Sequence, residues 1–169
     1  MRTHTHNRCL TATLITVIAT VAILLSMGAC DSINCPLNSS VEAYYTFCDL
    51  HGNRISISDT LTVSAVGTDQ VLVNKLSGKS EMTVPVSYYA ETDTLVLHLC
   101  DDDDMEATDT IWMDKVSTPH SDDPGCPYHV WHKVTAVRHT HYLIDTIIIV
   151  HPDINYDGLE NLQIHFITE

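Results

Sequence analysis

Basic residues are scarce in this chain, which has 8 Lys and Arg against 22 Asp and Glu among its 169 residues. Two of the basic residues, Arg2 and Arg8, precede residue 30, so the chain from residue 30 onward has six basic and 22 acidic residues and a formal charge of −16. Such a surface repels phosphate backbones, and we therefore expect no nucleic-acid partner. It also disfavours docking on anionic lipid headgroups, so we expect any membrane attachment to come from a covalent lipid.

The chain also lacks the short motifs of common catalytic centres. It has no Gly-x-Ser-x-Gly nucleophile elbow, no His-Glu-x-x-His zinc motif and no glycine-rich phosphate loop. None of the cysteine spacings is a Cys-x-x-Cys, which argues against a thiolate metal site. We therefore do not expect an enzyme, and we expect no cofactor.

The N-terminus has the three-part pattern of a secretory signal peptide. A positive segment with Arg2 and Arg8 precedes an apolar stretch over residues 10–25, and small residues then lead to Cys30. The stretch is too short, and too diluted by threonine, for a membrane-spanning helix of about 20 residues. The sequence SMGAC at 26–30 resembles a lipobox, with Met27 where that motif usually has Leu. We expect cleavage after residue 29 and acylation of Cys30, which attaches the protein to the bilayer.

This leader sets the expected domain organisation and location. Residues 1–29 are interpreted as the lipoprotein signal peptide, residues 30–40 as the lipidated cysteine with a short polar tether, and residues 41–169 as one domain. The location that follows is the cell envelope, with the protein lipid-anchored to a bacterial membrane. We expect this to be the outer membrane, and the sequence leaves open whether the domain faces the periplasm or the cell surface.

Apolar residues alternate with polar ones throughout the domain, and no helical period follows the leader. The predicted strands are 41–47, 60–65, 70–74, 82–87, 95–99, 109–113, 128–139, 144–150 and 162–166. We predict an all-β fold: a single antiparallel β-sandwich of seven to nine strands, immunoglobulin-like or transthyretin-like. The segment 144–150 is apolar on both faces, which favours a central position in its sheet.

A dipeptide recurs at the predicted strand starts. Asp-Thr followed by Leu or Ile occurs at 59–61, 93–95, 109–111 and 145–147. We interpret each Asp as closing a turn through its side chain, after which the β-branched Thr begins a strand.

The predicted strand 128–139 has two unequal faces. Alternation predicts that Tyr128, His132 and Val134 share the more apolar face, and that His129 and Trp131 point the other way.

No metal site is expected, although three groups come near one. Four adjacent carboxylates follow Cys100, namely Asp101, Asp102, Asp103 and Asp104, and we interpret them as a solvated loop. His139 and His141 would lie about 6.6 Å apart on one strand face, but no third ligand stands at a fixed spacing. Residues 153–158 begin like a calcium loop, yet Ile164 stands where that motif needs a bidentate Glu, so we predict a turn.

Short motifs spread from residue 30 to residue 166 resemble a group of uncharacterised lipoproteins of Bacteroidota-type bacteria. They are CDSINCPLN (30–38), DTLTV (59–63), VLVNK (71–75), VPVS (84–87), PH (119–120) with GCP (125–127), NYD (155–157) with EN (160–161), and IHF (164–166). The resemblance implies a membrane-anchored all-β domain of unassigned activity, with no catalytic residues to carry over.

Export predicts that cysteines pair, and Cys35, Cys48, Cys100 and Cys126 allow three connectivities that the spacing alone does not separate. In the resembling group, Cys35 and Cys126 look like standing features, whereas Cys48 and Cys100 look like additions. The resemblance thus implies a Cys35–Cys126 bridge and a Cys48–Cys100 bridge.

The function expected from the sequence is a membrane-anchored envelope lipoprotein that acts as a non-enzymatic binding or structural module. Its partner would be an envelope protein or a glycan. Two alternatives are a fimbria-associated or adhesin-like subunit that uses an edge strand, and a calcium- or transition-metal-binding module.

Overall fold

The computed structural model describes residue 35 and residues 41–68, 70–101, 106–121 and 124–167. The chain divides into a unit Met1–Asn34 and a unit Cys35–Glu169, and every strand belongs to the second unit. The expected signal peptide, Cys30 and all of the tether except Cys35 lie outside the described residues. Within the described ranges, no helix has the length and apolar character needed to cross a membrane.

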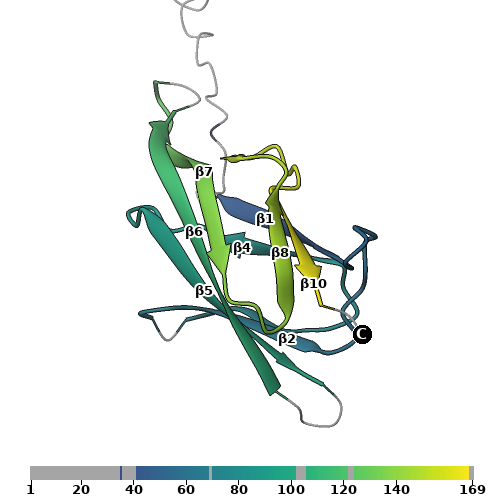
Figure 1. The fold of residues 1–169 in the computed structure, drawn as a ribbon. Helices are drawn as coiled ribbons and strands as arrows, with labels where there is room; N and C mark the ends of the chain where they lie inside the picture. The colour runs from purple at the N-terminus through teal and green to yellow at the C-terminus, as the bar shows by residue number, and fades with distance from the viewer. Residues whose placement is uncertain (1–34, 36–40, 69, 102–105, 122–123, 168–169) are drawn as a thin grey trace, which may run out of the picture. The chain divides into compact units, whose positions relative to one another are not determined.

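The described residues form ten strands in two sheets (Figure 1). The four-stranded sheet has the order β4-β1-β10-β8 and the six-stranded sheet the order β3-β2-β5-β6-β7-β9. The bounds are β1 Glu42–Cys48, β2 Thr60–Ala65, β3 Val71–Leu76, β4 Glu81–Pro85, β5 Thr92–Cys100, β6 Glu106–His120, β7 His129–His139, β8 Ile144–Ile149, β9 Asp153–Ile154 and β10 Leu162–Phe166. The predicted all-β sandwich is confirmed.

The core lies between the two sheets and follows the period of two. On β1 the alternate residues Ala43, Tyr45 and Phe47 are fully buried. Strand β5 contributes Leu95 and Leu97 from the opposite sheet, and the same inward alternation continues on β2, β6 and β10. Burying a large apolar side chain contributes about 1.5–3 kcal/mol, so these faces hold the two sheets together.

The arrangement of strands differs from the prediction in two respects. The first and last strands, β1 and β10, pair in parallel, with Phe47 opposite Ile164, so the sandwich is not wholly antiparallel. The apolar segment 144–150, predicted to be central, forms β8 at the edge of the four-stranded sheet, where Ile148 is 44% exposed. The period of two shows which face of a strand is buried, but it does not show which strands are neighbours.

Strand β7 also departs from the predicted alternation. His132 and Val134 are buried as expected, but His129 is only 2% exposed and Tyr128 is 79% exposed. The strand begins at His129, and the side chain of this residue packs edge-on against Tyr156, with ring centroids 5.3 Å apart. A contact with a loop 27 positions later in the chain thus buries a residue that the local pattern placed outside.

Asp109 is a charged residue near the start of β6, and it latches the turn between β7 and β8. Its carboxylate accepts hydrogen bonds from the backbone N–H groups of Tyr142, Leu143 and Ile144 at 3.1, 2.7 and 2.9 Å, and from the Thr140 hydroxyl. Burial raises the pKa of Asp109, but the hydrogen bonds from Thr140 and the three backbone groups outweigh it and lower the pKa below its usual value. The latch joins the two sheets, because β7 and β8 belong to different ones.

This position corrects the interpretation of the Asp-Thr dipeptides. Only the first copy begins a strand as predicted, since β2 starts at Thr60 directly after Asp59. The copies at 93, 109 and 145 lie inside β5, β6 and β8. The Asp109 side chain closes a turn more than 30 residues away rather than one beside it.

Replacing Asp109 tests the latch. We expect Asp109→Ala to lower the free energy of unfolding by about 3 kcal/mol, because three backbone N–H groups lose their acceptor in a buried place. Chemical denaturation at neutral pH measures the loss. The exposed Asp145 of the last Asp-Thr copy gives a matched control, and Asp145→Ala should change stability by about 0.5 kcal/mol or less. Equal losses of unfolding free energy in the two variants would show that the hydrogen bonds to Asp109 do not stabilise the fold.

Candidate functional site

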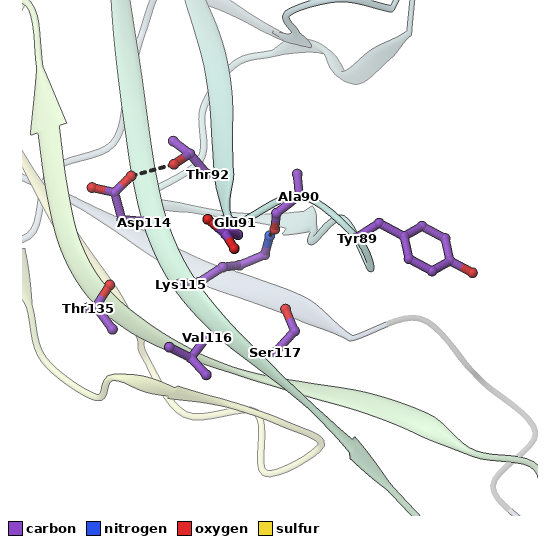
Figure 2. Close-up of a pocket in the computed structure, with 9 residues that line it drawn as sticks. All are labelled: Tyr89, Ala90, Glu91, Thr92, Asp114, Lys115, Val116, Ser117 and Thr135. Atoms are coloured by element: carbon purple, nitrogen blue, oxygen red, sulfur yellow. Dashed lines mark hydrogen bonds between the residues drawn. The ribbon is translucent and has the colours of Figure 1, made fainter.

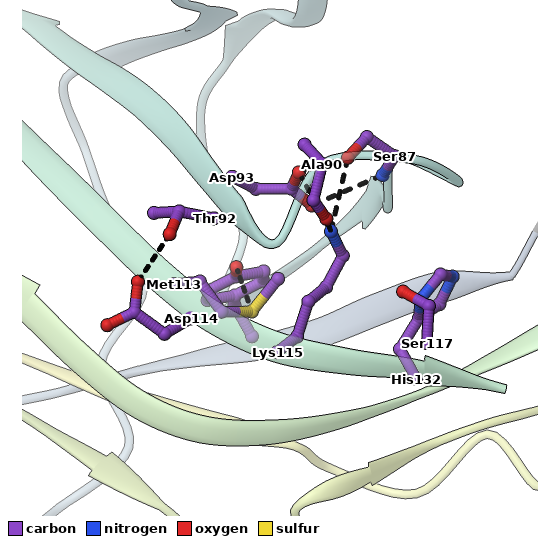
Figure 3. A network of polar contacts seen from close by, with 10 residues as sticks. Ser87, Ala90, Thr92, Asp93, Met113, Asp114, Lys115, Ser117 and His132 are labelled. Carbon is purple, nitrogen blue, oxygen red and sulfur yellow. Dashed lines mark hydrogen bonds and ion pairs between the residues drawn. The ribbon is translucent and has the colours of Figure 1, made fainter.

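The second charged residue on the inner face of β6 is Lys115, whose side chain has no exposed area. Its ammonium group donates to Ser87 Oγ at 3.1 Å, to Asp93 Oδ1 at 3.2 Å and to the carbonyl of Ala90 (Figure 3). A lysine ammonium has three protons to donate, and each has an acceptor here. A buried charge needs this compensation, since an unpaired ammonium in the interior costs several kcal/mol.

These bonds fix the connection between β4 and β5. The acceptors Ser87 and Ala90 lie in this loop, and Asp93 follows it at the start of β5. The Ser87 backbone N–H donates to Asp93 Oδ2 at 3.2 Å, and the Lys115 backbone N–H donates to the Glu91 carbonyl at 2.8 Å. Hydrogen bonds therefore fix the loop at Ser87 and at Glu91, and the Lys115 ammonium binds it between them at Ala90.

This fixed loop presents two tyrosines. Tyr88 is 37% exposed and Tyr89 is 99% exposed, and their rings meet edge-on at a centroid distance of 6.4 Å. Figure 2 shows the Tyr89 ring directed outward, away from Lys115. The loop that the buried ion pair holds therefore presents an aromatic ring with a polar hydroxyl in a fixed position.

A cleft of about 560 Å³ lies between this loop and β6 (Figure 2). Its polar lining includes Glu91, Thr92, Asp114, Ser117 and Thr135. The Thr92 hydroxyl donates to Asp114 Oδ1 at 2.6 Å, and Arg138 Nη2 lies 3.3 Å from the same oxygen. The bond from Thr92, followed by the charge and hydrogen bond of Arg138, lowers the pKa of Asp114. The lining thus offers carboxylate and hydroxyl groups to a polar ligand.

Ser117 and His132 form a pair that resembles a nucleophile beside its base. Ser117 Oγ lies 2.9 Å from His132 Nδ1. Burial, and after it the Lys115 charge, lower the pKa of His132 to about 4, although Asp93 opposes the shift. Its other ring nitrogen, Nε2, is buried and has no hydrogen-bond partner among the described residues. A neutral imidazole with this pKa and no orienting group is a poor base for activating a hydroxyl.

A second cluster of rings lies at the His120 end of β6. The rings of His120 and Trp131 stack at a centroid distance of 3.5 Å and an interplanar angle of 17°. Tyr156 meets Trp131 at 6.4 Å and His129 at 5.3 Å, both edge-on. The connection from β6 to β7 contains Cys126, and Tyr128 comes directly before β7. Rings from three separate segments are therefore gathered beside the disulfide.

The structure brings two of the candidate metal ligands together. The rings of His139 and His141 lie 4.4 Å apart, but no third His, Cys, Asp or Glu joins them among the described residues. Asp102, Asp103 and Asp104 lie outside those residues, and Asp101 alone of that group is described.

The predicted turn is present over residues 155–158, whereas Asp153 and Ile154 form strand β9, which pairs with β7. Asn155 Oδ1 and Asp157 Oδ1 accept the backbone N–H groups of Asp157 and Leu159 at 2.7 and 2.9 Å. Gly158 has a φ of +68°, which favours glycine, and Ile164 is buried in β10. These side-chain oxygens thus stabilise the loop itself.

One of the two predicted disulfides is confirmed. Cys35 and Cys126 are bonded, with Cα atoms 5.4 Å apart across a separation of 91 residues. The Cys48–Cys100 bridge is wrong, since neither residue forms a disulfide. Cys48 ends β1 in one sheet and faces Arg54, whereas Cys100 ends β5 in the other sheet between Thr60 and Glu106. Burial raises the pKa of the Cys48 thiol, which keeps it protonated.

The sequence interpretation missed Asp109, Lys115 and the Tyr89 loop. One signal was available, because Asp109, Ile111, Met113 and Lys115 alternate along one strand and all four are buried. A charged residue at each end of an inward-facing apolar series indicates buried polar partners.

The described part of the chain defines an all-β sandwich domain with a preorganised polar cleft. A model of the family of unknown function DUF6452 matches residues 60–166. The chain belongs to this family. The match begins in β2 and ends in β10, so it contains Asp93, Asp109, Lys115 and Cys126 but not Cys35 or β1. No curated protein and no solved structure matches the chain.

A double-mutant cycle tests whether Lys115 and Asp93 act as a pair. Lys115→Met leaves the Asp93 carboxylate buried and short of its main partner, so we expect a loss of about 3 kcal/mol or more in the free energy of unfolding. Adding Asp93→Leu removes that charge, and the double variant should recover a large part of the loss. Denaturant titration of the four proteins gives the coupling. Additive losses would mean that the two side chains do not interact.

Proposed function

We propose that this protein is a lipid-anchored lipoprotein of the bacterial cell envelope, and that its β-sandwich is a non-enzymatic binding module. Two sets of observations support the proposal. The leader, the lipobox and the disulfide support export and anchoring. The Tyr89 loop and its cleft support binding.

The observation that carries export is the Cys35–Cys126 disulfide. Disulfides persist in oxidising compartments outside the cytoplasm, and this bridge begins only five residues after Cys30. The bridge therefore agrees with the compartment that the leader predicts. The resemblance to Bacteroidota-type lipoproteins supports such a bacterium as the source, and we propose the outer membrane as the location.

The binding role is supported by the arrangement around Lys115. Interfaces are enriched in aromatic residues, and a rigid loop loses little conformational entropy when a partner orders it. Tyr89 stands fully exposed on such a loop, beside hydroxyl and carboxylate groups that can hydrogen-bond a sugar or a peptide. The charge of −16 argues against an anionic polysaccharide, so we propose a neutral or amino-sugar glycan or a protein of the envelope.

A specific observation also favours the edge-strand alternative. Strand β8 is the outer strand of its sheet, and it is Ile-rich with Ile148 exposed. An open apolar edge accepts a partner strand through backbone hydrogen bonds, as an adhesin-like or fimbria-associated subunit requires.

Mass analysis of the membrane-extracted protein tests the anchor. We expect a chain that begins at Cys30, carries acyl groups and gains two hydrogens on reduction of the single disulfide. Cys30→Ala should remove the acyl mass, because the variant lacks the thiol that accepts the lipid. In the wild-type protein, an unmodified Cys30 or a chain that retains residues 1–29 would contradict the proposal.

An array of neutral and amino-sugar glycans tests the recognition surface. We expect Tyr89→Ser to weaken binding about tenfold or more, since exposed aromatic anchors dominate such contacts. Tyr142→Ser is the matched control, because Tyr142 is 78% exposed but lies in the β7–β8 turn. Binding that is equal in the two variants would exclude the Tyr89 loop, and an array without signal would exclude these glycans as partners.

A further inference from the structure

The disulfide shortens the path from the membrane to the folded domain. Five residue steps separate Cys30 from Cys35, which limits their distance to about 17 Å. Without the bridge the first described residue of the sandwich would be Val41, eleven steps from Cys30 and up to about 37 Å away. The bridge thus roughly halves the reach of the tether, and it changes the point of attachment from β1 to the β6–β7 connection.

That connection lies at one end of two long strands (Figure 1). β6 has 15 residues and β7 has 11, which correspond to lengths of about 46 and 33 Å at a rise of about 3.3 Å per residue. His120 and His129 pair at the end that adjoins Cys126. Glu106 begins β6 at the opposite end, and Tyr142 follows the far end of β7. A tether of about 17 Å is shorter than either strand, so it distinguishes the two ends.

The end beside the disulfide is the aromatic one. Tyr128 lies two residues after Cys126 and is 79% exposed. Tyr156 is 39% exposed and packs on His129 and Trp131 behind it. Tyrosine and tryptophan are enriched at membrane–water interfaces, where an apolar ring and a polar tip are both accommodated. This kind of contact needs no basic patch, which agrees with the acidity of the chain.

We infer that the β6–β7 end, with Tyr128 and Tyr156, rests on the interfacial layer of the bilayer that holds the lipid of Cys30, so that the domain has a fixed orientation. The inference rests on the proposed lipid anchor. The short disulfide-bonded tether sets the approach, and the exposed tyrosines make the contact. The β7–β8 turn with Tyr142, at the far end of β7, is held away from the membrane.

Two exposed tyrosines at the two ends of β7 allow a matched experiment. Trp112 and Trp131 are first replaced by Phe, and one tryptophan is then introduced as Tyr128→Trp or as Tyr142→Trp. Acylation is verified by mass, and the lipidated proteins are reconstituted in phosphatidylcholine vesicles with a nitroxide on a fraction of the headgroups. We expect the quencher to remove about half or more of the emission at position 128 and about a tenth or less at position 142.

Two outcomes would overturn the orientation. One is equal quenching at the two positions, and the other is quenching at position 128 that survives when about ten Gly and Ser residues are inserted after Asp31. Loss of quenching after the insertion, with the disulfide intact, supports the short tether as its cause. The anchor is judged separately, because protein without an acyl mass, or protein that does not sediment with the vesicles, contradicts the proposed lipoprotein and not the geometry.

Discussion

Strand β6 buries two opposite charges on its inner face, and both must be compensated where water does not reach. Asp109 receives its hydrogen bonds from the β7–β8 turn, and Lys115 gives its own to the β4–β5 loop. Each compensation fixes a connection between a strand of one sheet and a strand of the other. The path of the chain between the sheets therefore depends on solvating these two charges with protein groups. The exposed Tyr89 follows from the second of them, since it belongs to the loop that Lys115 holds.

A third buried polar residue has the same role at the C-terminal side. The Asn161 side chain accepts from the Tyr44 N–H at 2.9 Å and donates to the carbonyls of His151 and Asp153 at 3.1 and 3.0 Å. It thereby ties β1 to the segment that leads through β9 to β10. Strand β9 has only two residues, so its ladder pairs few backbone groups. The Asn161 side chain supplies hydrogen-bond partners to backbone groups beside it.

The sequence predicted what depends on local alternation and missed what depends on distant contacts. Residues such as Tyr45, Leu97 and Ile164 were recognisable as core because every second residue near them is apolar. The parallel pairing of β1 with β10 and the edge position of β8 were not predictable in this way, since neighbours in a sheet are set by the whole fold. The burial of His129 depends on Tyr156, which no short window contains.

The residues of the candidate site also depend on contacts between distant parts of the chain, which local patterns do not show. The Cys35–Cys126 bridge was available from a resemblance between chains, but the second bridge failed because its cysteines end strands of different sheets. The Lys115 network joins residues that lie between positions 87 and 115 of the chain. Its one sequence signal is a lysine at a position that the alternation places inside the sandwich. A Lys or Asp within an alternating apolar series therefore indicates a buried charge with polar partners elsewhere in the chain.

The attachment of the tether at Cys126 also decides how the domain responds to mechanical force. Under the proposed lipid anchor, a pull on an unbridged chain would enter through the start of β1, which pairs with β4 and β10. With Cys35 bonded to Cys126, the pull passes into the connection between the two longest strands of the six-stranded sheet. The force then enters at the end of the β6–β7 ladder, and the segment from residue 36 to the start of β1 lies outside its path.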